Sequence, residues 1–439
     1  MNDEQTSNKK IISPAFIRRM AVCVFTGFTS GMPFFVLLSL LPIWLRDNAM
    51  NLDHIAKITA AAMLPYSLKF LWAWSLDIAL PFGFVGRRKF WTVITQLLLL
   101  CCTLLFLLCN PQDDFRFIAT LAAFFGFISA TADIAIDAYR REILPDRELG
   151  LGNSLHINAY RISKLIPGAL GLVLADIFSW QAAFLLCAAT IFAMILAVIF
   201  IFPEPQREAK APRTFEESVV LPFVEFFRRQ GKNAFFILIF LVLYKFGDSL
   251  ATTMQSAFIV DMHYSKIDIA KIEKLNSLWA SVVGAFIGGV VMLKIGINRS
   301  LWIFGVVQMI TILGFYWLAC SGPFDAIGAW EKWQLGIVIA GEYLGVGLGT
   351  AAFVAFIARE TNPAYAASQL ALFTSLTALP RTIFGAVSGF LVEGGKLFGW
   401  QFAGLGYANF FLLCFFLAIP GMLLLFKVAK FNEPQSSGV

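Results

Sequence analysis

Long apolar stretches separated by short polar connections extend from residue 16 to residue 427, and they constrain the fold more than any other feature of the chain. A helix needs about 20 apolar residues to cross the hydrocarbon core of a bilayer. Twelve stretches of that kind are present: 16–45, 54–80, 90–109, 116–138, 151–176, 181–202, 233–260, 270–293, 300–320, 333–358, 367–393 and 403–427. Charged residues make up 14% of the chain, against about 25% in soluble domains. The sequence therefore predicts an all-α membrane protein with twelve transmembrane helices.

The longest polar connection divides these spans into two sets of six. We expect an N-terminal six-helix bundle at 1–202, a cytoplasmic linker at 203–232 and a C-terminal six-helix bundle at 233–439. The fourth span of each half carries the same residues at the same spacing. They are Gly126, Thr131, Ala132 and Arg140 in the first half and Gly345, Thr350, Ala351 and Arg359 in the second. Membrane transporters built from parallel repeats show such internal similarity, so we predict that the two bundles are pseudo-symmetric.

A short basic loop at residues 86–89 (GRRK) follows Asp77 and precedes the third span. An acid that closes one membrane helix, followed by a basic turn that opens the next, resembles the loop between helices 2 and 3 of the major facilitator superfamily. Such a loop is expected to make gating contacts that hold one conformation. The residues that we assign to these contacts are Asp77, Gly86, Arg87, Arg88 and Asp137.

The distribution of cations predicts the orientation of the chain. Lys and Arg are retained on the cytoplasmic side of a bilayer. Most of the 34 Lys and Arg residues fall in the two tails and in the loops that are cytoplasmic when both termini are inside. The inverted topology would place most of them outside, so we expect both termini to face the cytoplasm.

Ionisable residues inside the predicted spans are the candidates for transport chemistry. A charge at the centre of a bilayer costs at least about 2.5–3.5 kcal/mol, so each one needs a partner, a water-filled cavity or a function. The cations that we single out are Lys69, Arg161, Lys164, Lys245 and Arg381, and the acids are Asp133, Asp137, Asp248 and Glu342. Lys245 and Asp248 stand three residues apart on one helical face, where they either neutralise each other or take part in binding and coupling.

Three of the cations belong to the fifth span of each half: Arg161 and Lys164 in the first, and Arg381 in the second. Because Arg161 and Lys164 are one turn apart and repel each other, they need a counter-anion, which is either Asp133 or the substrate. A guanidinium binds a carboxylate through two parallel hydrogen bonds, and Lys adds a point charge. We therefore expect a clamp for a small anionic substrate. The predicted substrate-binding residues are Arg161, Lys164, Arg381, Lys69 and Lys245.

Glu342 differs from the other acids because no cation lies within one turn of it on its own helix. A carboxyl with few compensating charges in a low-dielectric environment favours its protonated form, as a proton carrier requires. We expect Glu342 to carry the coupling proton, with Asp133 and Asp248 as alternatives. The proton gradient would then be the energy source, and no cofactor is implied.

Other classes of function find little support in the sequence. The three histidines are scattered, no His/Cys/Asp cluster has the spacing of metal ligands, and no nucleophile stands beside a base. The net charge is +6, and most of the cations lie in the tails and loops beside the membrane, so this charge does not indicate binding of nucleic acid. We expect a monomeric transporter in a lipid bilayer, neither an enzyme nor a metalloprotein. A non-transporting receptor on the same fold would have a similar sequence.

Several short motifs resemble those of the AmpG family of muropeptide permeases, a branch of the major facilitator superfamily, and they extend over nearly the whole chain. They are GFTSGMP at 27–33, LKFLW at 68–72, DIAIDA at 133–138, YR at 160–161, LYKFGD at 243–248, GTAAFVA at 349–355 and SQLAL at 368–372. The resemblance implies import of anhydro-muropeptides, or of their GlcNAc-linked forms, across the bacterial inner membrane. It also implies that the proton gradient drives this import. These substrates carry several carboxylates, which suits the five cations and four acids singled out above.

Two positions depart from the family pattern. Ala132 stands where the family usually has Gln before the acid, and Lys164 stands where an apolar residue is expected. A more cationic cavity would also suit another organic polyanion, such as a carboxylate siderophore. Relatives in the wider group resemble acetyl-coenzyme A carriers, another anionic cargo, so the cargo stays open at this point.

We predict that residue 210 faces the cytoplasm, because cations are concentrated in the 203–232 linker. In a variant without native cysteines, Lys210→Cys should resist a membrane-impermeant maleimide in intact cells and react after permeabilisation. Asp113→Cys, in a predicted external loop, is the matched control and should react in both. Labelling of position 210 from outside would overturn the orientation.

Overall fold

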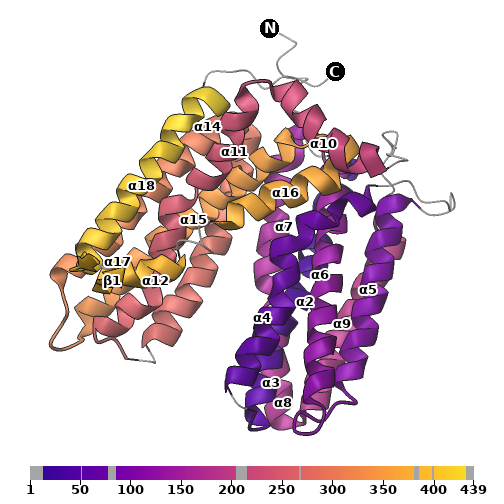
Figure 1. The fold of residues 1–439 in the computed structure, drawn as a ribbon, viewed down its shortest axis with the longest axis horizontal. Helices are drawn as coiled ribbons and strands as arrows, with labels where there is room; N and C mark the ends of the chain where they lie inside the picture. Colours follow the sequence, from indigo (N-terminus) through magenta and orange to yellow (C-terminus); the bar gives the residue numbers. More distant parts are fainter. Residues whose placement is uncertain are drawn as a thin grey trace. The chain divides into compact units, whose positions relative to one another are not determined.

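The computed structural model describes residues 13–50, 52–77, 86–203, 215–265, 268–379, 385–397 and 400–431. Its elements divide into two compact units (Figure 1). Unit 1 comprises Met1–Val224 and Glu360–Leu372, and unit 2 comprises Glu225–Arg359 and Phe373–Val439.

Unit 1 is built from helices that pack lengthwise in pairs: α2 along α7, α4 along α6, and α5 along α9 (Figure 1). The helices are α2 (Pro14–Phe35), α3 (Leu41–Asp47), α4 (Leu52–Leu68), α5 (Arg87–Phe106), α6 (Phe115–Ile143), α7 (Leu149–Ser163), α8 (Gly171–Ile177) and α9 (Trp180–Phe200). Shorter turns join them: the π-helices η2 (Val36–Leu40) and η6 (Ile166–Leu170), and the 3-10 turns η3 (Lys69–Leu71), η4 (Ala73–Leu76), η5 (Asp146–Glu148) and η8 (Pro363–Tyr365). Helix α10 (Phe215–Gln230) crosses the boundary between the units in the sequence.

Prolines mark the places where helices of unit 1 change geometry. Pro33 lies in the last turn of α2, directly before η2, and Pro167 lies inside η6. Pro65 precedes the end of α4, which continues as the 3-10 turn η3. Proline lacks an N–H group and its ring clashes with the carbonyl four residues earlier, so the regular hydrogen-bond ladder cannot continue through it.

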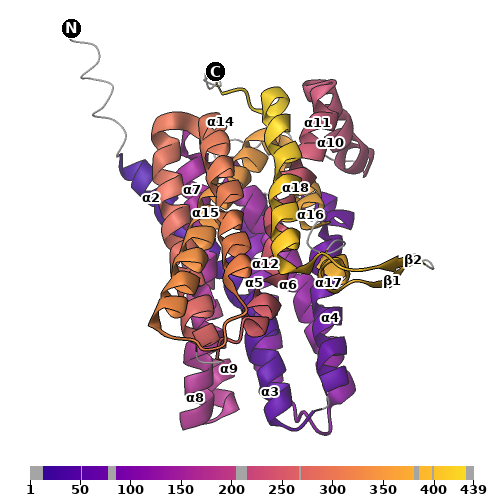
Figure 2. The ribbon, with the colours of Figure 1, turned by 90° about the vertical axis from the view of Figure 1, so that its left-hand side faces the viewer.

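Unit 2 is also helical, and α18 packs against α11, α12 and α14 (Figure 2). Its elements are α11 (Asn233–Leu243), α12 (Phe246–Asp261), the π-helix η7 (Ile269–Leu275), α14 (Asn276–Ser321), α15 (Ala329–Glu360), α17 (Gly385–Glu393) and α18 (Gly406–Val428). Helix α16 (Ala366–Leu379) begins within unit 1 and ends within unit 2. Two short antiparallel strands, β1 (Gly395–Leu397) and β2 (Trp400–Phe402), form a ribbon between α17 and α18.

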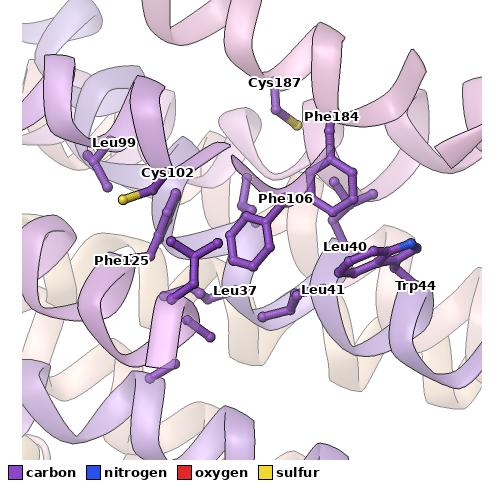
Figure 3. Packing of buried hydrophobic residues seen from close by; sticks show 14 of the residues in the cluster. Leu37, Leu40, Leu41, Trp44, Leu99, Cys102, Phe106, Phe125, Phe184 and Cys187 are labelled. Atoms are coloured by element: carbon purple, nitrogen blue, oxygen red, sulfur yellow. The ribbon is translucent and has the colours of Figure 1, made fainter. Parts of the chain in front are cut away.

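Aromatic side chains form much of the core of each unit. In unit 1, Phe106 stacks on Phe184 with ring centroids 5.7 Å apart, and Trp44 meets Phe184 edge to face (Figure 3). In unit 2, Phe315 stacks on Phe411 at 5.1 Å. Such aromatic pairs contribute about 0.5–1.5 kcal/mol beyond the burial of their area, and they join helices that are distant in the sequence.

Among the described residues, eight helices are long and apolar enough to cross a membrane. One of them, Lys271–Ser321, covers the two predicted spans 270–293 and 300–320. Gly296, with a positive φ of 81°, interrupts α14 between these spans. The predicted spans 54–80, 151–176 and 367–393 are interrupted by 3-10 turns, by a π-helix or by residues outside the described ranges. The predicted helical fold is confirmed. Once the kink at Gly296 and the interrupted spans are counted, the helices agree with twelve transmembrane segments.

Candidate transport site

A buried charge cluster in unit 1 centres on Asp133 of α6. Its carboxylate accepts hydrogen bonds from Ser30 Oγ at 2.5 Å and from Lys69 Nζ at 2.6 Å. Lys69 opens the 3-10 turn η3, and its side chain is 8% exposed. This ion pair supplies the local compensation that a charge inside a membrane span requires. A direct counter-charge of Asp133 is therefore Lys69, from a helix distant in the sequence.

Asp137, one turn further along α6, extends the cluster. Its Oδ1 accepts a hydrogen bond from Arg140 Nη2 at 2.8 Å, and its Oδ2 lies 4.0 Å from Lys69 Nζ. Arg140 also donates from Nε to Asn153 of α7 at 2.7 Å. Two cations, Lys69 and Arg140, thus balance the two acids Asp133 and Asp137 inside one unit.

The second cluster surrounds Arg88 in the first turn of α5. The Arg88 side chain is 1% exposed and that of Asp77 is fully buried. Nη2 of Arg88 donates to Asp77 Oδ1 at 2.6 Å, and Nε donates to Glu142 Oε1 at 2.8 Å. Nη1 donates to the carbonyl of Leu76 at 2.8 Å. All three guanidinium nitrogens therefore have acceptors, a condition under which a buried ion pair is tolerated.

Asp77 also binds the start of α16. Its Oδ1 accepts the backbone N–H of Ala367 at 3.2 Å, and its Oδ2 accepts both the backbone N–H and the hydroxyl of Ser368, at 2.9 and 2.7 Å. The first N–H groups of a helix have no partner within the helix, and the positive end of the helix dipole favours an anion. One carboxylate therefore holds both Arg88 and the beginning of α16.

Gly86 and Arg87 complete the basic loop. Gly86 is the N-cap residue of α5. Arg87 donates from Nη1 to the backbone carbonyl of Asp77, and its Nη2 lies 3.4 Å from Glu142 Oε1. Four of the predicted gating residues are thus adjacent, whereas Asp137 belongs to the cluster around Asp133. The gating role itself stays a prediction.

Unit 2 buries its charges with less compensation. Lys245 Nζ lies 3.0 Å from Asp248 Oδ2, as the i, i+3 spacing predicts. Glu342 on α15 is 0% exposed, and neither of its oxygens has a hydrogen-bond partner among the described residues. Asp248 and Thr311 are its neighbours, but the Thr311 hydroxyl donates to the Gln308 carbonyl instead. Among the described residues, the two carboxyls of Asp248 and Glu342 therefore lie near the single cation of Lys245.

The three cations predicted to form the clamp differ in their surroundings. Lys164 is exposed at the C-terminal end of α7, and its Nζ lies 5.9 Å from the centroid of the Phe35 ring. Within the described ranges, Lys164 forms no ion pair. Arg161 is half-buried in the last turn of α7. Arg381 lies outside the described residues.

Three residues that complete these clusters are not among those predicted from the sequence: Ser30, Glu142 and Ser368. Glu142 falls beyond the predicted fourth span, 116–138, whereas α6 extends to Ile143. Ser30 and Ser368 stand within the motifs at 27–33 and 368–372. A motif marks such a residue, but it does not say which acid the hydroxyl binds.

Comparison with known proteins decides the family. The sequence profile described as Major Facilitator Superfamily matches residues 23–385. An anhydromuropeptide permease of Escherichia coli strain K12 is 33% identical over 409 residues, which cover 93% of this chain and 79% of that protein. The chain belongs to the AmpG-like branch of the major facilitator superfamily. An uncharacterized protein of Haemophilus influenzae is 50% identical over 431 residues, 98% of this chain and 99% of the relative.

A solved structure with the same architecture is that of the human organic anion transporter MFSD10 (TETRAN). It matches with a TM-score of 0.67 and covers 94% of this chain and 100% of the human chain, at 14% sequence identity. At this identity the likeness concerns the fold alone. The family and the facilitator fold predicted from the sequence are confirmed, and the family places the chain among multi-pass membrane transporters rather than enzymes.

Asp77→Asn should destabilise the protein strongly, because it leaves the Arg88 guanidinium buried beside a neutral amide. Breaking a buried pair in this way costs about 3–5 kcal/mol, which thermal unfolding of the detergent-solubilised protein would report. The matched control is Asp146→Asn, because Asp146 is 49% exposed and pairs with Arg141 at 3.2 Å. Exposed pairs contribute about 0–1 kcal/mol. Equal shifts in the two variants would contradict the assigned role of the Asp77 cluster.

Proposed function

We propose that the protein imports anhydromuropeptides across the bacterial inner membrane, using the proton gradient and alternating access. The observation that carries this proposal is the 33% identity with an anhydromuropeptide permease over 93% of the chain. The motifs at 27–33, 133–138 and 349–355, which resemble the same family, lie in both halves of the sequence. The protein would act as a monomer with both termini in the cytoplasm, and it would need no cofactor besides the proton gradient.

Glu342 is our candidate for the proton carrier. If it were ionised, it would place a second negative charge near Asp248, with Lys245 as the neighbouring cation. Ionised groups with so little compensation are costly in a membrane, and such residues mark proton relays. Binding of a proton removes the excess charge, and its release restores it, so occupancy of Glu342 can be linked to the transport cycle. Asp248 and Asp133 are the alternative carriers.

The substrate would be held by cations. The carboxylates of a muropeptide need counter-charges, and Lys164 is exposed without an ion pair in the described part of the chain. Arg161, one turn earlier on α7, and Arg381, at the corresponding place in the second half, would complete the clamp. Lys69 and Lys245 already have acidic neighbours, so they would contribute to the substrate site by exchanging partners.

Another organic polyanion, such as a carboxylate siderophore, is the second candidate cargo. The observation that favours it is Lys164 itself, an exposed cation at a position where an apolar residue is expected, together with Ala132 in place of Gln. A counterflow measurement distinguishes a receptor on the same fold, which does not transport, from a carrier of either cargo. Only a carrier exchanges labelled cargo across the liposome membrane.

We predict that Lys164→Met weakens binding of the true cargo in proportion to its carboxylates. The thermal shift produced by an anhydromuropeptide should fall in this variant, and the shift produced by a tricarboxylate siderophore should fall further if the cargo has diverged. Lys232→Met removes an exposed cation between α10 and α11 and serves as the control for net charge. Stabilisation of the wild-type protein by a siderophore, but not by an anhydromuropeptide, would contradict the proposed cargo.

We predict that Glu342→Gln abolishes gradient-driven accumulation and leaves counterflow measurable. Exchange needs only reorientation of the loaded carrier, whereas net cycling needs a carboxyl that releases its proton. Glu331→Gln makes the same change in the first turn of the same helix and should accumulate cargo normally. Accumulation near the wild-type level in Glu342→Gln would move the coupling role to Asp133 or Asp248.

A further inference from the structure

Helix α10 (Phe215–Gln230) is too short to be one of the candidate membrane spans, yet one side of it is apolar and exposed. Four large side chains recur at positions i, i+3, i+4 and i+7, the spacing of a single helical face. They are Val220, Phe223, Val224 and Phe227, and each is between 43% and 49% exposed. A contiguous apolar surface of this kind marks a place that another body covers. We call these four residues the α10 stripe.

A polar side lies opposite the α10 stripe. Glu225 Oε1 and Arg229 Nε form an i, i+4 ion pair at 2.8 Å. Because successive residues of an α-helix are rotated by about 100°, this pair projects from the side of α10 that faces away from the stripe. Arg228 stands between the two sides and is exposed, and Lys232, just after the helix, is exposed as well. Within the described ranges, neither Arg228 nor Lys232 forms an ion pair.

The neighbours of α10 place it at the level where membrane spans begin. Its last residue, Gln230, stands three residues before Asn233, the first residue of α11 (Figure 2), so the two are at most about 11 Å apart. In the middle of α10, the carbonyl of Pro222 accepts a hydrogen bond from Gln369 Nε2 at 2.9 Å, and Gln369 lies in the first turn of α16. Because α11 and α16 both open predicted membrane spans, α10 lies beside the membrane surface.

A lipid surface suits the α10 stripe better than a soluble partner does. The chain passes within a few residues from the stripe into α11, whose Phe235 is itself 64% exposed and faces lipid in a membrane span. The exposed cations Arg228 and Lys232 stand at the same junction, where anionic headgroups attract basic residues. A helix with an apolar side, an opposite polar side and cations at the border is typical of helices that lie in the membrane–water interface.

We propose that α10 lies in the membrane–water interface, with the α10 stripe inserted among the lipid acyl chains and with Arg228 and Lys232 bound to the phosphates of anionic phospholipids. The leaflet is the one at which α11 begins, which is cytoplasmic in the orientation proposed above. The long side chains of Arg and Lys reach from an apolar surface to the headgroups. Neither the cargo nor the proton coupling enters this inference, so it stands or falls independently of them.

The test uses the full-length protein without its native cysteines, reconstituted in vesicles of phosphatidylcholine and phosphatidylglycerol. Phe223→Cys carries an environment-sensitive fluorophore. Its emission should be quenched by phospholipids with a nitroxide near the headgroup end of the acyl chain, more strongly than by those with a nitroxide at the bilayer centre, because such helices insert by about 5–10 Å. Aqueous iodide should quench it weakly. Arg229→Cys, on the opposite side of the same helix, is the matched control and should be quenched mainly by iodide.

The role of the two cations is measured with the fluorophore on Phe227→Cys. Quenching by nitroxide-labelled phosphatidylglycerol should exceed quenching by nitroxide-labelled phosphatidylcholine about twofold at equal mole fraction, because basic residues near the surface attract anionic lipid. Combining Arg228→Gln with Lys232→Gln should remove this excess. Lys271→Gln, which removes an exposed cation from η7, should leave it unchanged. Equal quenching by the two lipids without these substitutions would refute the assignment of Arg228 and Lys232.

A phospholipid with a diazirine in its acyl chain tests the insertion in the wild-type protein, without any substitution. After illumination, adducts should appear on residues 220–227 as well as on α11. Adducts on α11 without adducts on 220–227 would overturn the proposal. Iodide quenching as strong at position 223 as at 229 would do the same, because the stripe would then face water. Protection of position 223 from both quenchers would also contradict it, since a protein segment or a partner protein would then cover the stripe.

Discussion

The buried charges of unit 1 lie against counter-charges from other segments of the chain. In an apolar surrounding, each ionised side chain must find its counter-charge and its hydrogen bonds within the protein. Unit 1 meets this requirement at places where helices begin, end or change geometry. Arg88 lies in the first turn of α5 between Asp77 and Glu142, and Lys69 reaches Asp133 from the turn that closes α4. The cations of these two clusters, Arg88 and Lys69, thus reach their acidic partners from a helix start and from a turn at a helix end.

In unit 2, the described buried charges are compensated less completely, and the proposed role of Glu342 depends on this difference. Lys245 faces both Asp248 and Glu342, and the oxygens of Glu342 have no hydrogen bonds within the described residues. A fully compensated cluster holds the structure in place, whereas a carboxyl short of partners responds to a proton. We therefore propose that the Asp77 cluster has a structural and gating role and that the group around Glu342 has a coupling role.

The sequence predicted the helical fold because the length and apolarity of a membrane span are set by the bilayer, and both can be counted along the chain. It also identified the buried charges, since a Lys or Asp stands out in an apolar run. It did not predict that Lys69 pairs with Asp133, because such a pairing depends on how two distant helices are rotated. Glu142 was not predicted because α6 continues one turn past its apolar part.

We propose that an inward proton gradient drives accumulation of an anhydromuropeptide. The most direct measurement is the internal concentration of labelled anhydromuropeptide in proteoliposomes with an acidic exterior, together with the internal pH. The probe should accumulate above its external concentration while protons enter, and a protonophore should abolish the accumulation. Equal internal and external concentrations, unaffected by the gradient, would contradict it.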